Sequence, residues 1–151
     1  MTAPRFSVLT PVFDPVPDHL GAWLASVTRQ RGATFEHVLV DDGSTVPEVA
    51  GVLAAAQSTH QRVHVRAANG GIVAASNDAL AAATGEWLVL LDHDVELAPG
   101  ALAALAAALD ADPDAGVAYS DHDQIRPDGR YANPSYKPDL SPERLRRHNW
   151  I

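Results

Sequence analysis

The sequence has no cysteine, a single methionine and no long apolar run among its 151 residues. Without cysteine, the chain cannot form disulfides or any zinc or iron–sulfur site that needs thiolates. No apolar segment reaches the roughly 20 residues that span a bilayer. The N-terminal stretch Met1–Phe6 lacks the apolar core of a secretory signal. We therefore expect a cytoplasmic protein.

Basic residues are also scarce: 11 Lys and Arg stand against 19 Asp and Glu, a formal charge of −8. This balance argues against nonspecific binding to nucleic acid, which requires a basic surface. A small phosphorylated ligand remains compatible, because a metal ion can bridge it to acidic side chains. The basic residues near the C-terminus indicate either a solvated surface or peripheral contact with an acceptor or membrane lipid. They are Arg126, Arg130, Lys137, Arg144, Arg146 and Arg147.

Apolar runs of strand length alternate with segments of helical periodicity. With 46% hydrophobic and 20% charged residues, the chain is typical of one globular domain, which we assign to residues 1–151. The alternation predicts an α/β fold with a doubly wound, mostly parallel sheet flanked by helices. The predicted strands are Phe6–Thr10, Phe35–Val40, Arg62–Arg66, Trp87–Leu91 and a short fifth strand at Gly116–Tyr119. The predicted helices lie near residues 20–27, 47–58, 72–83 and 99–113.

The composition changes after Ser120. Residues 121–142 are rich in Pro, Asp, Gly and Tyr, which favours an ordered loop or a small hairpin with a turn at Pro127–Gly129. Ser141–Glu143 is typical of a helix N-cap followed by proline at the first helical position. We therefore separate residues 1–120 from residues 121–151.

Two acids, Asp92 and Asp94, directly follow the apolar strand Trp87–Leu91. A near-continuous apolar run predicts a parallel strand buried on both faces. Two close carboxylates are costly unless a cation shares them, and a hard divalent ion is the usual partner. We expect His93 to point away from both acids and to take no part. Asp121 and Asp123 form a second such pair, but the strand before Asp92 is longer and should be more central.

Two further motifs follow predicted strands. Val40-Asp-Asp-Gly-Ser44 is either a tight turn that caps the next helix or a site where a carboxylate binds a nucleobase or ribose. Asn69-Gly-Gly71 opens a helix, either as a close-packed cap or with free N–H groups near phosphates. Strand ends meet at one edge of a parallel sheet, so Thr10 should converge with the acids of both motifs.

The ordered set of motifs resembles the family 2 glycosyltransferases, which have the GT-A fold. Four segments carry the resemblance: Ser7–Val12, Val40–Ser44, Asn69–Gly71 with Asn77, and Asp92–Asp94. Two C-terminal segments, Tyr119–Asp123 and Tyr136–Pro142, resemble the branch that builds bacterial surface polysaccharides. The resemblance covers nearly the whole chain.

The resemblance implies a site for a nucleotide-diphosphate sugar. It places Thr10 and Pro11 beside the base, and Asp42 (or Asp41) on the base or ribose. Asp92 would contact ribose and metal-bound water, while Asp94 would coordinate Mg²⁺ or Mn²⁺ at the diphosphate. Asn69 and Gly70 complete the expected donor site. Residues 1–120 would thus form the nucleotide-sugar-binding part, and residues 121–151 the start of the acceptor side.

The resemblance also implies transfer with inversion to a glycan or lipid-linked acceptor, at the inner face of the membrane. In relatives the general base follows the equivalent of Ile151, so we expect this chain to be truncated and its catalytic base to be missing. A non-catalytic fragment that only binds nucleotide-sugar, or acts as an interaction module, is the first alternative. A nucleotidyltransferase is the second, although Thr10–Asp14 stands where that class has a glycine-rich basic loop.

Overall fold

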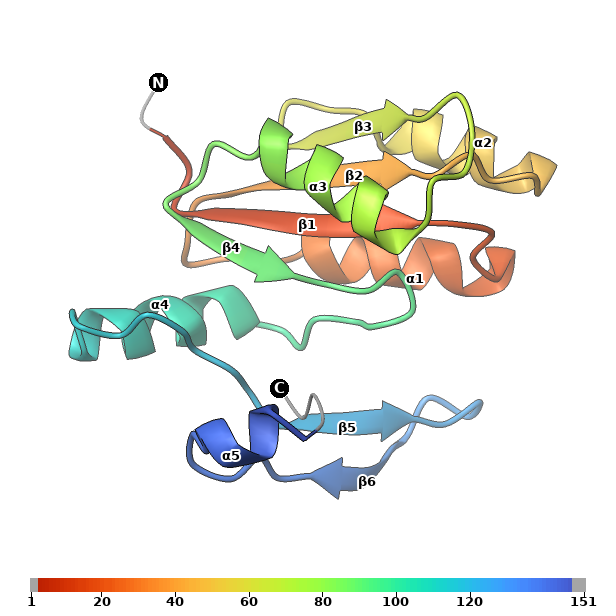
Figure 1. The fold of residues 1–151 in the computed structure, drawn as a ribbon. Helices are drawn as coiled ribbons and strands as arrows, with labels where there is room; N and C mark the ends of the chain where they lie inside the picture. The colour runs from red at the N-terminus through yellow and green to blue at the C-terminus, as the bar shows by residue number, and fades with distance from the viewer. Residues whose placement is uncertain (1–2, 148–151) are drawn as a thin grey trace. The chain divides into compact units, whose positions relative to one another are not determined.

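The computed structural model describes residues 3–147, which belong to two compact units, Met1–Ala106 and Ala107–Ile151. A four-stranded sheet, ordered β3-β2-β1-β4, forms the centre of the first unit (Figure 1). All its strand pairs are parallel, as expected. The strands are β1 (Phe6–Val12), β2 (Phe35–Asp41), β3 (Gln61–Val65) and β4 (Trp87–Leu90). The doubly wound α/β prediction is therefore confirmed for this unit.

Helices cover both faces of this sheet. Figure 1 shows α3 across one face, while α1 and α2 lie behind the other. Proline occupies the first turn of α1 and of α2, where its missing N–H costs no hydrogen bond. The helix bounds are α1 (Pro17–Thr28), α2 (Pro47–Ala56), α3 (Ile72–Ala82) and α4 (Ala101–Ala111).

The two faces of the sheet are packed differently. Under α3, small alanine side chains let the helix approach a cluster of aliphatic residues on β1 and β2. The opposite face holds larger side chains, including Trp23 of α1, whose ring meets the His37 ring edge-on at 5.7 Å between centroids. Burial without a charged partner lowers the pKa of His37 to about 3, so this imidazole is neutral.

The order of the strands reverses beside β1. The chain passes from β1 to β2 and β3 on one side, and then returns through α3 to β4 on the other side of β1. In open α/β sheets such a reversal leaves a crevice at the carboxyl ends of the strands, where ligands bind. The topology therefore predicts a ligand site among the residues that follow β1, β2 and β4.

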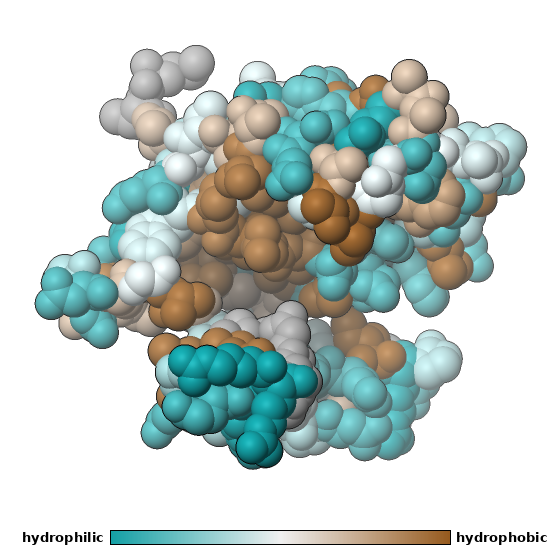
Figure 2. All heavy atoms as spheres, viewed as in Figure 1, coloured by the Kyte–Doolittle hydropathy of each residue, from teal (hydrophilic) through white to brown (hydrophobic). Residues whose placement is uncertain are grey.

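The prediction that Trp87–Leu91 is a central strand buried on both faces is wrong. Among the described residues β4 pairs only with β1, so it lies at an edge of the sheet. Leu90 is 80% exposed and Leu88 is 46% exposed. Figure 2 shows an apolar surface over this part of the first unit. An apolar run alone did not reveal that α3 covers β1 and β2 but leaves this face of β4 open.

A buried polar cluster joins the strands at the end opposite to the crevice. Glu36 of β2 accepts hydrogen bonds from the Ser7 hydroxyl at 2.6 Å and from the Thr84 amide at 2.7 Å. Burial alone would raise the pKa of Glu36, but these hydrogen bonds and the Arg62 guanidinium hold it below its usual value. The cluster thus fixes the loop between α3 and β4 against the start of β1.

Gly85, in that loop, allows a close approach that no other residue permits. A Cβ atom at Gly85 would lie 2.6 Å from the Ser7 backbone nitrogen. We expect Gly85→Ala to lower the free energy of unfolding by about 1–3 kcal/mol, the usual cost of overpacking. Gly51→Ala is the matched control, because nothing lies within 4 Å of that position in α2. It should stabilise the chain by about 0.5–1 kcal/mol. Equal losses in urea unfolding of the two variants would contradict this account.

The second unit contains the predicted hairpin. Strands β5 (His122–Ile125) and β6 (Tyr131–Ser135) pair antiparallel, and the turn between them includes a Gly129 N–H to Arg126 C=O bond of 2.8 Å. Helix α5 (Pro142–Leu145) begins at the predicted cap, where the Ser141 hydroxyl accepts from the Arg144 amide at 3.4 Å.

The predicted strand at Gly116–Tyr119 is wrong, because that segment has no strand partner among the described residues. In residues 3–147, every helix is too short or too polar to traverse a bilayer. The separate roles assigned to residues 1–120 and 121–151 remain a prediction.

Candidate functional site

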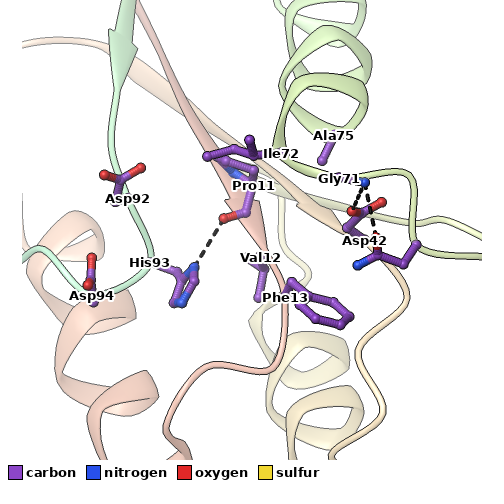
Figure 3. Close-up of a pocket in the computed structure, with 11 residues that line it drawn as sticks. Pro11, Val12, Phe13, Asp42, Gly71, Ile72, Ala75, Asp92, His93 and Asp94 are labelled. Atoms are coloured by element: carbon purple, nitrogen blue, oxygen red, sulfur yellow. Dashed lines mark hydrogen bonds between the residues drawn. The ribbon is translucent and has the colours of Figure 1, made fainter. Parts of the chain in front are cut away.

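A cavity of about 370 Å³ opens at the carboxyl ends of β1, β2 and β4 (Figure 3). Its volume is within the range of pockets that bind small molecules and cofactors. The structure thus brings together motifs that are far apart in the sequence. The lining residues are Pro11, Val12, Phe13, Asp42, Asn69, Gly71, Ile72, Ala75, Asp92, His93 and Asp94.

Asp42 holds the loop that precedes α3. Its two carboxylate oxygens accept the amide protons of Gly70 at 2.9 Å and of Gly71 at 2.7 Å. Arg66 adds an ion pair, with 3.0 Å between its Nε and Asp42 Oδ1. The side chain of Asp42 is only 4% exposed, so these bonds compensate a charge that is almost excluded from solvent. The predicted motifs at Asp42 and Asn69–Gly71 are therefore parts of one structure.

The other residues of the β2 turn support this arrangement. Asp41 is buried, and its Oδ1 accepts the Ser44 amide at 3.0 Å, which is a turn contact outside the cavity lining. Gly43 has φ of +77°, and a Cβ there would lie 3.1 Å from the Asn69 nitrogen. Glycine is therefore needed for both the left-handed turn and the close approach of the loop. The tight-turn interpretation holds for Asp41, whereas Asp42 faces the cavity.

Thr10 is fully buried and does not line the cavity. Its hydroxyl lies 3.1 Å from His37 Nε2, and Gln61 Nε2 lies 3.2 Å from His37 Nδ1. Because the Gln61 amide nitrogen can only donate, Nδ1 accepts and Nε2 donates to Thr10. Thr10 thereby anchors the end of β1, and its neighbour Pro11 reaches the cavity wall.

The apolar wall of the cavity includes Phe13 and Ile72, which the sequence-based hypothesis did not include in the site. Phe13 is 43% exposed and Ile72 is 65% exposed. The turn after Phe13 is held by Asp14, which has φ of 42°. Asp14 accepts the backbone amides of Thr45 at 2.6 Å and of Val46 at 3.1 Å, and this lowers its pKa. Phe13 directly follows β1, and this position at the carboxyl end of a parallel strand could have identified it as a site residue.

Asp92 and Asp94 lie in the turn that follows β4. Both are exposed, and among the described residues neither carboxylate has a hydrogen bond or an ion pair with another side chain or amide. The second acidic pair differs, because Asp121 accepts the Lys137 amide at 2.7 Å. Of the two acidic pairs, only the first lines this cavity with both carboxylates lacking a partner in the described part of the chain.

His93 also lines the cavity, and its lack of a role remains a prediction. Its ring turns towards β1, away from the two carboxylates (Figure 3). The Nδ1 atom lies 3.3 Å from the carbonyl oxygen of Pro11.

The two carboxylates fit a divalent cation only as part of a shared site. Within residues 3–147, no group of three or more His, Cys, Asp or Glu side chains could hold a metal ion by itself. Mg²⁺ and Mn²⁺ prefer oxygen ligands, and Mg²⁺ is commonly bound by one or two carboxylates together with substrate phosphates and water. Asp92 and Asp94 supply the right kind and number of protein ligands for such a site.

The parallel sheet with reversed strand order and helices on both faces defines an α/β domain with the GT-A architecture. The chain matches the family described as "Glycosyl transferase family 2" over residues 7–149, and it belongs to that family.

Two relatives align with nearly the whole chain. It is 42% identical to "Uncharacterized protein y4gI" of Sinorhizobium fredii over 98% of this chain and 16% of that protein. It is 37% identical to "O-antigen biosynthesis protein RfbC" of Myxococcus xanthus over 98% of this chain and 12% of that protein. The chain therefore spans less than a fifth of the length of either relative.

Solved structures share the fold. Staphylococcus aureus TarS 1-349 in complex with UDP-GlcNAc gives a TM-score of 0.63 at 26% identity, over 77% of this chain and 37% of that one. The mannosyltransferase PcManGT from Pyrobaculum calidifontis, in complex with GDP-Man and Mn²⁺, gives 0.61 at 29% identity over 74% and 34%. These similarities confirm the predicted family and the GT-A fold.

Proposed function

We propose that the cavity binds a nucleotide-diphosphate sugar together with Mg²⁺ or Mn²⁺, and that the chain is the donor-binding part of a glycosyltransferase. The observation that carries this proposal is the electrostatic asymmetry of the cavity. Its lining contains three carboxylates and neither lysine nor arginine. Arg66 compensates Asp42, while Asp92 and Asp94 have no partner among residues 3–147.

A diphosphate would be repelled by Asp92 and Asp94 unless a cation lay between them. The same two carboxylates would attract a divalent cation, and the cation would then attract the diphosphate. When bound, such an ion neutralises the charge that develops on the departing nucleoside diphosphate. The structures of TarS with UDP-GlcNAc and of PcManGT with GDP-Man and Mn²⁺ support this class of ligand.

The rest of the cavity suits the nucleoside. Phe13 offers an exposed aromatic ring and Ile72 an aliphatic surface for the flat face of a base. Asn69 adds an amide that can donate or accept hydrogen bonds. Asp42 and Gly70 contribute by holding the loop between these residues. We assign Pro11 to the wall beside the base and Thr10 to its support.

For the transfer itself we propose inversion at the sugar and a glycan or lipid-linked acceptor. The name of the Myxococcus relative, with its role in O-antigen biosynthesis, supports an acceptor of this kind. The general base was expected beyond Ile151, and this prediction falls outside the described residues. Peripheral contact with the inner face of the membrane remains part of the proposal, with the C-terminal basic residues as its basis.

A thermal-shift series tests donor binding directly. At 100 times Kd, ligand binding stabilises a protein by about 2.7 kcal/mol. For a chain of this length that amounts to a rise in Tm of roughly 5–10 °C. We expect this rise for at least one of UDP, GDP, ADP or CDP with Mn²⁺ or Mg²⁺, and a much smaller one without the metal. No shift with any of these combinations would refute donor binding by this chain.

A further inference from the structure

The turn that carries Asp92 and Asp94 is joined to β1 by a side chain where the sheet would otherwise use its backbone. In the β1–β4 ladder Leu9 is the partner of Leu90, and the Leu91 amide donates to the Leu9 carbonyl at 3.1 Å. In a regular parallel ladder residue 11 would next bond residues 91 and 93, but proline has no N–H to donate to residue 91. The remaining ladder bond would run from the amide of residue 93 to the Pro11 carbonyl. Instead, His93 Nδ1 lies 3.3 Å from that oxygen.

Because the His93 side chain takes the place of a backbone amide, the backbone can leave the sheet while the turn stays bonded to β1. Strand β4 ends at Leu90, and a turn follows in which the Val95 amide donates to the Asp92 carbonyl at 3.2 Å. A carbonyl oxygen only accepts hydrogen bonds, so Nδ1 must carry the proton. The imidazole therefore replaces one bond of the sheet in the turn that carries the two carboxylates.

Both partners of this hydrogen bond line the cavity. Pro11 belongs to the wall assigned to the nucleoside, and His93 stands between the two residues assigned to the cation. We propose that His93 is a positioning residue, whose bond to Pro11 sets the distance between the cation end and the nucleoside end of the site. It would thereby couple binding of the cation to binding of the nucleotide. The coupling rests on the proposed function. The hydrogen bond between His93 and Pro11 does not depend on it.

Three variants of His93 distinguish a positioning role from a role in packing alone. Asparagine can place its side-chain N–H where Nδ1 lies, so His93→Asn should keep the bond to Pro11. Glutamine reaches further and resembles the Nε2 position, so His93→Gln should lose the bond while remaining polar. His93→Ala removes the side chain altogether.

The coupling is measured as the ratio of the nucleotide Kd without Mn²⁺ to the Kd with Mn²⁺, for the diphosphate that binds best. We expect this ratio to fall by about tenfold in His93→Ala and His93→Gln, within the usual range of coupling between sites. His93→Asn should retain most of it. If His93 only packs, its variants would change Tm and both Kd values in parallel, and an unchanged ratio would overturn the proposal.

The hydrogen bond has an independent test in the ligand-free chain. Long-range ¹H–¹⁵N correlation at a pH where imidazoles are neutral should show the His93 proton on Nδ1, with the signal identified by its loss in His93→Asn. A proton on Nε2 would overturn the proposal even if nucleotides bind. Conversely, failure of every nucleotide to bind would refute the proposed function and the coupling, while the proton on Nδ1 would still be observed.

Discussion

Replacing Asp94 by asparagine should abolish the metal-dependent part of nucleotide binding. The side chain keeps its size but loses the charge that attracts the cation, and it has no internal hydrogen bond or ion pair to lose among residues 3–147. The fold should therefore be unaffected, with a change of no more than about 0.5 kcal/mol in the free energy of unfolding. The metal-dependent rise in Tm, roughly 5–10 °C in the unaltered chain, should disappear.

The chain offers an unusually close control for this experiment. Asp121-His-Asp123 repeats the tripeptide Asp92-His-Asp94, and Asp123 is also exposed. Asp123→Asn removes the same charge from the same local sequence and should leave the metal-dependent rise in Tm intact. If Asp123→Asn lost it and Asp94→Asn kept it, the cation site would have been assigned to the wrong pair.

Replacing Asp42 by alanine should cost both stability and nucleotide binding. The change leaves the Arg66 guanidinium without its buried partner and removes the acceptor of two amides, those of Gly70 and Gly71. Breaking a buried pair by removing one member costs about 3–5 kcal/mol. Arg66 is 25% exposed, so we expect the lower end of this range. A loss of about 3 kcal/mol corresponds to a fall in Tm of roughly 6–12 °C.

Asp78→Ala is the control, because Asp78 is the other carboxylate bound to Arg66, at 2.9 Å, and is 55% exposed. A solvent-exposed ion pair contributes at most about 1 kcal/mol, so this variant should remain close to the unaltered chain in urea unfolding and in nucleotide binding. Similar losses in Asp42→Ala and Asp78→Ala would show that Asp42 does not have the special role assigned to it.

Asp42→Asn adds a test of how Asp42 acts. If the carboxylate mainly holds the loop, affinity should fall by a similar factor for every nucleoside diphosphate that binds. A loss confined to one base would instead indicate direct contact between Asp42 and that base.

Much of the fold and part of the site could be predicted from the sequence, because both depend on regular patterns. Apolar runs separated by helical periodicity predicted the strands and helices of the first unit, and the parallel order then required the strand ends to meet. That is why Asp42, Asn69 and the acids at 92 and 94 were expected together, and they do line one cavity.

The parts that could not be predicted depend on tertiary contacts between specific side chains. An apolar run does not reveal which neighbours cover it, so β4 was expected at the centre of the sheet and lies at its edge. Similarly, Thr10 looked like a cavity residue, but its hydroxyl points to His37 inside the core. The bond from His93 to Pro11 lies beyond the end of β4 at Leu90, and an apolar run gives no sign of such a side-chain contact.

The central claim is that a divalent cation and a nucleoside diphosphate bind together where β1 and β4 end. Paramagnetic broadening by Mn²⁺ tests it most directly, with backbone amide NMR signals recorded at a low ratio of Mn²⁺ to protein in the presence of the nucleotide. We predict the strongest broadening at residues 92–95, with weaker effects at 12–13 and 69–72. Maximal broadening at residues 121–123, or uniform broadening along the chain, would contradict the claim.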